Sequence, residues 1–376
     1  MNIGTISLNI NTHDFNYGAL LHSWAFQQWL KRQNCVSNTE VIDYITPMLE
    51  KHDRDHPIKS ALRERHLRTF VKNLVYSRPY KERLDKFNTF IDNNLEVSKE
   101  KYTHATLDSA DLSYDTVICE SDVIWSPDFF GGKLDYSFFL ACNSMRNMNK
   151  IAYSPSMGDG VIDKSNLEEI KRYLEGINHI SCRESYDVPI LQSLTSKQVT
   201  HVVDPVLLLG ENDYEEIVAQ RIIKKHYALL YLPVDDNKVL RENAYRYCKE
   251  NGLAMIEIAT NLEQTKAPDV MTLTNAGIEE FLSGIKYADI IFTNSFHAIC
   301  FAVIYKKEFY AFNRGSSGKV KDICKVLGMP ERFFDNNEFA PLNPINYDSV
   351  YERLKEMRSK SVNWLNYAIN TSGGTS

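Results

Sequence analysis

The stretch Ile290-Ile-Phe-Thr-Asn-Ser-Phe-His297 predicts the unit around which the rest of the chain is organised. Its apolar beginning, Ile290 to Phe292, lies between Asp289 and three polar residues, which is typical of a buried parallel strand. An apolar run that ends at Tyr305 follows at once and is long enough for a buried helix. A strand, a short polar turn and a helix make half of a βαβ unit, and open parallel sheets bind ligands at this junction.

The polar turn in this stretch carries groups that suit an anion. Ser295 is placed to cap the helix, and His297 falls in its first turn. The amides of a helix N-terminus favour negative charge, and a histidine there can donate a proton or contact an anion. The alternative interpretation is a capping turn with a packed imidazole.

The first half of the chain repeats the same pattern. A strand over residues 2–9 leads to a helix over 17–30, which Asn16 caps and whose Gly18 permits a close approach. Four later strands each end in polar or charged residues: 116–119 before Glu120-Ser121-Asp122, 150–153 before Ser154 to Gly158, 179–182 before Arg183-Glu184-Ser185, and 200–203 before Asp204-Pro205. Because parallel strands place their carboxyl ends at one edge, we expect these turns to line one cleft.

After Gly210 the pattern restarts, which predicts a second α/β domain in this chain of 376 residues. The expected strands are 227–232, 254–258, 290–292 and 308–312, and the expected helices are 238–250, 278–286, 297–305, 319–327 and 347–366. The turn before the helix at 17–30 is not a GxGxxG motif, so we infer no dinucleotide.

Composition narrows the class of protein. The net charge of −6 argues against a general nucleic-acid binder. The sequence has no window of 18 apolar residues, so we expect no transmembrane helix. Its first residues lack the basic start and apolar run of a signal peptide. The seven cysteines are odd in number and form no CxxC pair, which favours reduced thiols in a cytosolic protein without a zinc site.

One segment, Lys51 to Lys86, departs from the overall charge because it holds eleven basic and five acidic residues. Apolar residues at helical spacing give it a second, apolar face. It is equally well interpreted as a solvated helical excursion packed on the domain or as a membrane-surface segment.

Seven collinear segments resemble the polysaccharide pyruvyl transferase family. They are Asn16-Tyr17-Gly18-Ala19, Val41 to Tyr44, Ser121-Asp122 with Trp125, Ala152 to Gly158, Ile180 to Ser185, Val203 to Leu209, and Thr293 to Phe309. Two positions depart from the family's pattern. Glu120 stands where the family usually has glycine, and Lys319 stands where it usually has arginine, which keeps the charge but loses the bidentate fork.

The resemblance implies two Rossmann-like domains that face each other across a cleft, as in a GT-B-like α/β fold. Residues 1–210 are the expected acceptor-side domain, with a basic helical insertion at about 51–90. Residues 211–345 are the expected donor-side domain, followed by a helix over 346–370 that packs back and a disordered tail over 371–376.

The resemblance also implies transfer of a pyruvyl group from phosphoenolpyruvate to two hydroxyls of a sugar, which forms a cyclic ketal and releases phosphate without a metal or cofactor. The expected acceptor is a galactose-type sugar in a bacterial cell-surface or capsular polysaccharide precursor, linked to a polyprenyl diphosphate. Such an enzyme is expected in the cytoplasm, in peripheral contact with the anionic inner face of the plasma membrane.

The residues can be assigned roles in this reaction. We expect His297 to donate the proton or hold the phosphate, Arg183 to contact the donor, and Asp122 or Glu184 to act as base, with Asp122 preferred. The expected substrate-binding residues are Asn16, Tyr17, Gly18, Ser121, Ser156, Gly158, Asn294, Ser295, Phe296, Arg314 and Lys319. The expected contacts to the membrane or to the acceptor diphosphate are Arg63, Arg65, Arg68 and Lys72.

Two other functions stay open from the sequence. One is a GT-B glycosyltransferase that uses a nucleotide sugar. The other is a non-catalytic relative that keeps the fold and binds glycan, which the departures at Glu120 and Lys319 allow.

Overall fold

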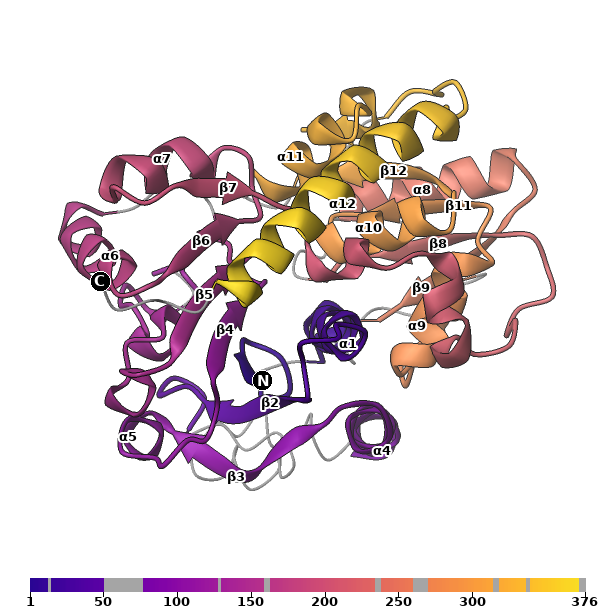
Figure 1. Cartoon of the computed structure of the whole chain (residues 1–376). Coiled ribbons are helices and arrows are strands. Elements are labelled where there is room, and N and C mark those ends of the chain that lie inside the picture. The colour runs from indigo at the N-terminus through magenta and orange to yellow at the C-terminus, as the bar shows by residue number, and fades with distance from the viewer. Residues whose placement is uncertain are drawn as a thin grey trace. The chain divides into compact units, whose positions relative to one another are not determined.

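The computed structural model describes residues 1–12, 15–50, 77–127, 130–158, 163–233, 238–259, 270–313, 318–335 and 339–371. The chain divides into two compact units, each built on its own sheet (Figure 1). The first unit comprises Met1–Arg54, Ile91–Leu209 and Leu354–Ser376, and the second comprises Asp55–Phe90 and Gly210–Arg353. The sequence prediction of two Rossmann-like α/β domains is confirmed.

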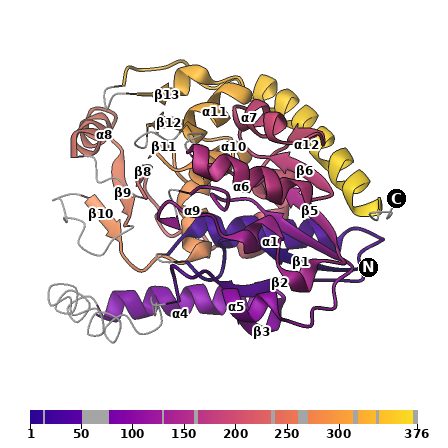
Figure 2. The same ribbon diagram turned by 90° about the vertical axis from the view of Figure 1, so that its left-hand side faces the viewer.

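The first unit contains a seven-stranded parallel sheet in the order β3-β2-β1-β4-β5-β6-β7. Its strands are β1 (Asn2–Ile6), β2 (Asn38–Ile45), β3 (Val97–Thr103), β4 (Thr116–Glu120), β5 (Asn149–Tyr153), β6 (His179–Cys182) and β7 (Val199–His201). Its helices are α1 (Tyr17–Lys31), α5 (His104–Asp108), α6 (Lys164–Glu175) and α7 (Asp187–Leu194), with short 3-10 turns η2 (Tyr136–Phe139), η3 (Asn143–Met145) and η4 (Pro205–Leu208). Helix α1 lies on one face of this sheet and α5, α6 and α7 lie on the other (Figures 1 and 2).

The second unit contains a six-stranded parallel sheet in the order β10-β9-β8-β11-β12-β13. Its strands are β8 (Tyr227–Tyr231), β9 (Ala254–Ile258), β10 (Val270–Leu273), β11 (Ile290–Thr293), β12 (Glu308–Phe312) and β13 (Phe333–Phe334). Its helices are α8 (Lys238–Glu250), α9 (Ile278–Lys286), α10 (Phe296–Ile304) and α11 (Lys319–Val326), with 3-10 turns η5 (Glu211–Ile217) and η6 (Pro330–Arg332).

The organising stretch of the sequence folds as predicted. Every residue of β11 is buried, and the strand pairs with β8 on one side and β12 on the other. The side chains of Ile290 and Phe292 join the cluster that includes Leu240 of α8. Burial on both faces explains why this strand is a continuous apolar run rather than an alternating one.

The sequence prediction missed strands at the edges of the sheets. Strand β3 includes Ser-Lys-Glu-Lys and has only one buried residue, Ser98, and β10 is likewise only partly buried. An edge strand has one hydrogen-bonded neighbour and tolerates charge, so it lacks the apolar run that marks a central strand.

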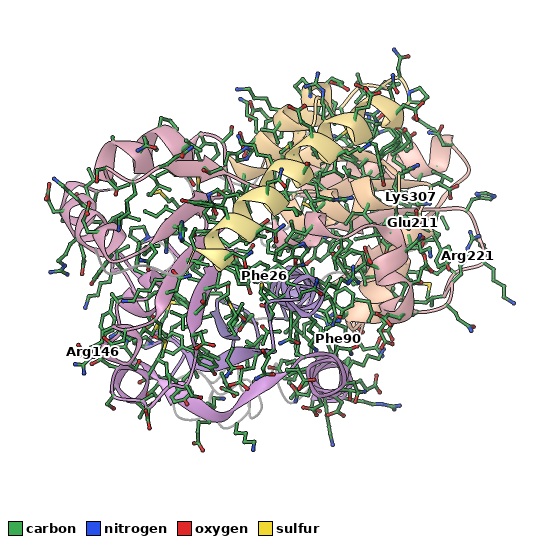
Figure 3. All side chains as sticks on the ribbon, viewed as in Figure 1. Phe26, Phe90, Arg146, Glu211, Arg221 and Lys307 are labelled. Atoms are coloured by element: carbon green, nitrogen blue, oxygen red, sulfur yellow. The ribbon has the colours of Figure 1, made fainter. Side chains whose placement is uncertain are left out.

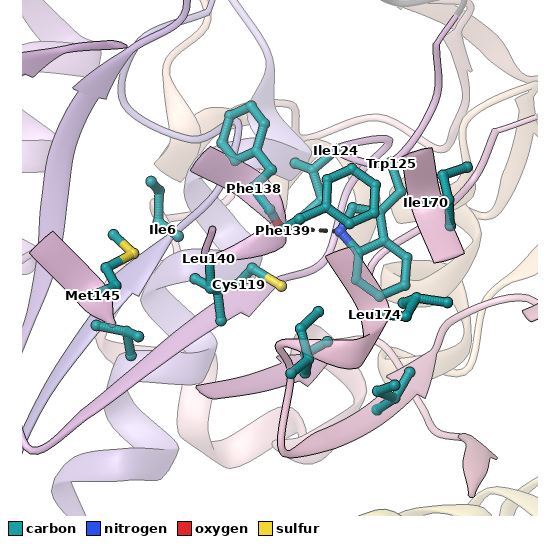
Figure 4. Close-up of a cluster of buried hydrophobic side chains, with 14 of the residues drawn as sticks. Ile6, Cys119, Ile124, Trp125, Phe138, Phe139, Leu140, Met145, Ile170 and Leu174 are labelled. Carbon is teal, nitrogen blue, oxygen red and sulfur yellow. Dashed lines mark hydrogen bonds between the residues drawn. The ribbon is translucent and has the colours of Figure 1, made fainter. Parts of the chain in front are cut away.

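A cluster of buried apolar side chains in the first unit includes Trp125 (Figure 4). The indole Nε1 donates to the carbonyl of Phe138 at 3.0 Å, and the ring stacks on Phe139 with centroids 4.9 Å apart. Figure 3 contrasts Phe26, buried within α1, with Arg146, which extends from the surface. Burial of these large rings supplies much of the free energy that holds the strand ends in place.

Helix α4 (Ser77–Asn94) begins in the second unit and ends in the first. The buried Arg83 donates to the carbonyl of Ala259 at 2.7 Å, and Lys86 forms an ion pair with Glu280. Residues 77–90 therefore group with the second unit, whereas the sequence had led us to place the whole segment 51–90 with the N-terminal domain. The rest of that segment, with Arg63, Arg65, Arg68 and Lys72, lies outside the described residues.

The last helix, α12 (Tyr347–Asn370), belongs to the second unit as far as Arg353 and to the first unit from Leu354. In the first unit, Arg358 donates to the carbonyls of Leu207 and Leu209, and Ser361 accepts from the amide of Val203. No helix among the described residues has the length and apolar character needed to cross a bilayer.

Candidate functional site

In the second unit, the turn between β11 and α10 is fixed by its own polar side chains. Thr293 donates through its hydroxyl to the carbonyl of Tyr231 at 2.6 Å and accepts from the amide of Ser295 at 3.0 Å. The hydroxyl of Ser295 accepts from the amide of Ala298 at 3.3 Å. Ser295 is therefore the N-cap predicted from the sequence, and the turn is rigid before any ligand binds.

His297 lies in the first turn of α10, as predicted, and is 9% exposed. Its ring meets that of Phe296 edge to face, with centroids 5.3 Å apart. The neighbouring Asn294 is buried, and no described residue donates a hydrogen bond to its Oδ1. A buried amide oxygen without a donor costs about 1–3 kcal/mol, so the group is a candidate ligand contact.

The basic residues that the sequence assigned to the donor lie in the chain after β12. Lys319 is the first residue of α11, preceded by Gly318. Arg314 lies outside the described residues. Of the two basic residues expected to bind the donor in this domain, Arg314 and Lys319, the structure therefore describes Lys319.

In the first unit, the residues after β4 adopt a strained backbone. Ser121 and Asp122 have φ values of 52° and 50°, in the left-handed region that is unusual for residues other than glycine. Asp122 is 7% exposed, accepts from the amide of Val123 at 2.7 Å and lies 3.5 Å from the side-chain amide of Asn16. Strain held in place by surrounding structure is common at functional sites.

Asn16 also confirms its predicted role as N-cap of α1, because its Oδ1 accepts from the amide of Ala19 at 3.2 Å. Its amide nitrogen faces Asp122, so one side chain links the start of α1 to the turn after β4. Tyr17 and Gly18, expected to line the site, are buried in the first turn of this helix.

Arg183 is bound inside the first unit. Its Nε lies 2.7 Å from Glu184 and its Nη1 lies 3.5 Å from Asp204, and all three side chains are almost fully buried. Burial alone lowers the pKa of Arg183, but the two carboxylates raise it above its ordinary value. The guanidinium charge is already balanced, which favours a positioning role over the donor contact expected from the sequence.

One of these two carboxylates, that of Asp204, also holds the strained turn. Asp204 accepts from the hydroxyl of Ser121 at 2.6 Å, so the end of β7 is tied to the end of β4. The substrate-contact role expected for Ser121 and the base role expected for Glu184 therefore compete with internal bonds. Glu184 is nearly inaccessible and paired with Arg183, whereas Asp122 keeps some exposure.

Ser156 and Gly158 shape this edge from the loop after β5. The amide of Ser156 donates to the carbonyl of Asp122 at 2.8 Å, and its hydroxyl accepts from the amide of Gly158 at 3.1 Å. Gly158 has φ of 77°, and a Cβ there would meet Ser126 at 2.8 Å. Both residues are buried, so they support Asp122 rather than line a ligand surface.

Sequence reasoning missed Asp187, which begins α7 and is completely buried. It accepts from the amide of Met157 at 3.2 Å. Burial, and after it the nearby charge of Glu184, raises the pKa of Asp187 to about 8, so the carboxyl holds a proton at neutral pH. The available signal was an acid in the first turn of the helix that follows Arg183-Glu184.

Glu120, the departure from the family's pattern, has its own buried partners. Its carboxylate lies 2.7 Å from His22 and accepts from Ser23 at 2.5 Å, and Ser23 accepts from Asn9 at 3.0 Å. Burial raises the pKa of Glu120, and Glu120 raises that of His22 against the effect of burial, so the pair shares a proton in the interior. Glu120 is therefore hydrogen-bonded to two residues of α1, His22 and Ser23.

Among the residues that the structure describes, no three His, Cys, Asp or Glu side chains are grouped so that they can hold a metal ion.

Comparison with solved structures finds similarity across the whole chain at low identity. UDP-GlcNAc 2-epimerase from Methanocaldococcus jannaschii is 13% identical over 98% of this chain and 100% of its own, with a TM-score of 0.53. MnaA from S. aureus, solved with UDP, is 12% identical over 98% of this chain and 97% of its own, with a TM-score of 0.51. The GT-B-like fold class expected from the sequence is confirmed.

Comparison of the sequence with those of curated proteins finds no match. The family model for polysaccharide pyruvyl transferase, in contrast, matches residues 16–316. This range includes the strained turn at Ser121 and Asp122 and the two capped helix starts at Asn16 and Ser295. The chain therefore belongs to the polysaccharide pyruvyl transferase family.

Proposed function

We propose that this protein transfers the pyruvyl group of phosphoenolpyruvate to two hydroxyls of one sugar, forming a cyclic ketal and releasing phosphate. The observation that carries the proposal is His297 in the first turn of α10, within a chain of the pyruvyl transferase family. The proposed reaction uses no metal or organic cofactor.

The donor is proposed to bind at the turn that precedes α10. Phosphoenolpyruvate carries a phosphate and a carboxylate, and the positive end of a helix dipole stabilises such groups. Lys319 adds a cation at the start of α11, and Asn294 brings an amide group to the same turn. His297 is within one helical turn of the Ser295 cap, where a proton donor for the donor's methylene carbon is needed.

The reaction then proceeds through two additions. A proton from His297 reaches the methylene carbon, and the first sugar hydroxyl adds to the cationic carbon as it loses its own proton. Cleavage of the carbon–oxygen bond to phosphate regenerates a cationic carbon. The second hydroxyl adds there and loses its proton. Of the two hydroxyl protons, one replaces the proton given up by His297 and the other leaves on the phosphate, so one phosphoenolpyruvate and one diol yield one ketal and one hydrogen phosphate.

Asp122 is the proposed base for the hydroxyl protons. It is the more accessible of the two carboxylates chosen from the sequence, since Glu184 is buried against Arg183. Its strained turn is held by Asn16 and by the loop around Ser156. A residue positioned in this way reaches its proton without reorganisation.

The proposed acceptor is a galactose-type sugar of a cell-surface or capsular polysaccharide precursor, carried on a polyprenyl diphosphate at the inner face of the plasma membrane. The basic residues Arg63, Arg65, Arg68 and Lys72 are proposed to attract that surface, at about 1 kcal/mol for each residue near it. In the described part of the basic segment, Arg83 and Lys86 are already engaged by the second unit.

The membrane proposal is tested by changing the four basic residues to glutamine together. We expect weaker and more salt-sensitive binding to anionic vesicles and a raised KM for a lipid-linked acceptor, with the KM for phosphoenolpyruvate unchanged. Unchanged vesicle binding removes the membrane role and leaves a soluble acceptor.

The activity itself is tested by phosphate release from phosphoenolpyruvate with galactose-, glucose- and mannosamine-type acceptors. We expect phosphate release that depends on the acceptor. We also expect a product whose mass exceeds that of the acceptor by the added pyruvyl group. Protection against heat by a nucleoside diphosphate but not by phosphoenolpyruvate would instead indicate a glycosyltransferase. The absence of acceptor-dependent release with any of these sugars contradicts the proposal.

A further inference from the structure

A second polar cluster lies at the carboxyl end of β2 and β3 in the first unit. The hydroxyl of Tyr44 donates to Asp135 at 2.6 Å and lies 3.1 Å from Nδ1 of His104. The same Nδ1 lies 3.3 Å from Asp135 and 3.4 Å from the hydroxyl of Ser137. These residues take no part in the proposed donor or base chemistry.

The cluster is rigid because its centre is buried. Asp135 accepts from both Tyr44 and the amide of Ser137, and it caps η2. Burial, followed by the charge of Asp135, raises the pKa of Tyr44, so the phenol keeps its proton and donates. A buried carboxylate with these donors fixes the imidazole of His104 in one orientation.

The outer side of this cluster is available. The side chain of His104 is 27% exposed, and no described residue hydrogen-bonds its Nε2. The ring of Tyr136, also partly exposed, lies against the imidazole with centroids 4.0 Å apart. An aromatic surface next to a polar ring nitrogen can pack on the C–H face of a sugar while bonding one of its hydroxyls.

The surrounding charge excludes an anionic ligand. The hydrogen bond to Asp135 raises the pKa of His104, against the effect of burial, and Asp108 and Glu50 add to the rise. Asp135 thus contacts the imidazole directly, and two further negative charges act on it from a greater distance. Neither phosphoenolpyruvate nor a diphosphate is favoured there, whereas a neutral, hydroxyl-rich ligand pays no charge repulsion.

The position of the cluster separates it from the proposed base. In the order β3-β2-β1-β4, the end of β3 is three strands from the end of β4, which is roughly 14 Å at the usual strand spacing. One pyranose ring does not span that distance, but two or three linked sugars do.

We infer that His104 and Tyr136 form a subsite for a second, non-reacting sugar of the acceptor glycan. The inference rests on the proposed function in one respect, the identification of the bound glycan as the acceptor. Asp135, Tyr44 and Ser137 are the positioning residues that hold the subsite.

Direct binding tests the subsite without turnover. The probes are lactose, N-acetyllactosamine and cellobiose, each compared with the methyl glycoside of its non-reducing sugar by ligand-observed NMR titration. We expect at least one disaccharide to bind more tightly than its monosaccharide. Tyr136→Leu and His104→Gln should each raise the Kd of that disaccharide about fivefold, the loss expected for one aromatic contact, with the monosaccharide Kd unchanged.

Matched variants separate this contact from a general effect. Tyr136→Phe keeps the ring and should keep wild-type affinity. His179→Gln and Tyr367→Leu alter a second histidine–tyrosine ring pair, with centroids 5.4 Å apart, that lies at the amino end of β6, and they should have no effect. Thermal melting confirms that each variant is folded.

Three results overturn the inference. The first is that no disaccharide binds more tightly than its monosaccharide, and the second is that disaccharide binding is equal in wild type, Tyr136→Leu and His104→Gln. The third is equal weakening of disaccharide and monosaccharide, which would make this the reacting subsite. A failed phosphate-release assay with intact disaccharide binding counts against the pyruvyl transfer alone.

Discussion

The carboxyl edges of the two sheets differ in the charges that they bury. In the first unit the part of the edge formed by β4 to β7 holds five buried carboxyl groups together with one guanidinium and one imidazole, from Glu120, Asp122, Glu184, Asp187, Asp204, Arg183 and His22. In the second unit the turn after β11 holds neutral groups, Thr293, Asn294 and Ser295, with His297 in the first turn of the helix that follows. The turns after β4 and β11, which occupy corresponding places in the two sheets, therefore bury different charges.

Under the proposed function, this difference bears on where each substrate binds. We expect a doubly anionic donor at the helix end and Lys319 of the second unit rather than beside the carboxylates of the first. A neutral polyol is compatible with the acidic edge, where carboxylates accept its hydroxyl protons. The predictions below test this comparison from both sides.

The largest expected effect is on catalysis in the second unit. His297→Ala should lower turnover by about 10²–10⁴-fold, the range for a lost general acid, with the KM for phosphoenolpyruvate changed much less. His226→Ala is the matched control, because His226 is exposed and pairs with Asp289. Steady-state kinetics and thermal melting of both variants check the prediction. Wild-type turnover by His297→Ala would make this histidine structural.

The second prediction concerns stability in the first unit. Arg183→Ala removes the countercharge of two buried carboxylates, Glu184 and Asp204, and should lower the free energy of unfolding by about 3–5 kcal/mol. Arg172→Ala breaks an exposed pair with Glu169 and should cost less than about 1 kcal/mol. Urea unfolding measures both. A stable Arg183→Ala variant that only loses affinity for phosphoenolpyruvate would restore the donor contact expected from the sequence.

The third prediction uses the raised pKa of Asp187. The pKa of Asp187 is about 8 in the folded protein, whereas the unfolded chain releases the proton near the ordinary aspartate pKa of 3.8. The folded state thus binds one more proton between these values, and the contribution of Asp187 to stability falls as pH rises through that window. Asp187→Asn cannot ionise, so it should become progressively more stable than wild type, by a few kcal/mol at pH 8.

Urea unfolding of wild type and Asp187→Asn at pH 5, 6.5 and 8 measures this difference directly. Asp92→Asn, which removes an exposed carboxylate on α4, is the matched control for the loss of one acid. A constant difference between wild type and Asp187→Asn at the three pH values would show that Asp187 is ionised in the folded protein.

The parts of the site that the sequence predicted are those determined locally. The caps Asn16 and Ser295 bond to amides three residues away, and apolar runs mark the buried strands. These features depend on neighbours along the chain, so their residue types reveal them.

The parts that the sequence did not predict depend on distant partners. Glu120 bonds to His22 across 98 residues, and Arg183 meets Asp204 across 21. A sequence shows that these residues are charged but not which distant charges they meet, so it predicts a donor contact for Arg183 and does not reveal the pair with Asp204. Residues 77–90 were likewise assigned by their order in the chain, although Arg83 bonds to Ala259.

The smallest expected effect concerns backbone strain, which also differs between the units. Among the described residues other than glycine, those with φ in the left-handed region are Ser121, Asp122, Leu140 and Ser154 in the first unit and Lys306 in the second. Ser154 is completely buried, and its hydroxyl has no hydrogen-bond partner among the described residues. Lys306 is exposed and follows α10, at the end remote from His297.

Glycine adopts this conformation without strain, so Ser154→Gly and Lys306→Gly should each stabilise the protein by about 1 kcal/mol or less, after the entropy gained by the unfolded chain. Their effects on turnover should differ. Ser154 has both a strained backbone and a buried hydroxyl without a hydrogen bond among the described residues, and it precedes the loop that supports Asp122. If this strain helps to position Asp122, Ser154→Gly should lower turnover. Lys306→Gly should not, because the strain there terminates a helix far from the donor turn. Urea unfolding and phosphate release on both variants test the pair. Equal turnover in the two variants would mean that the strain at Ser154, like that at Lys306, shapes only the local backbone and does not position Asp122.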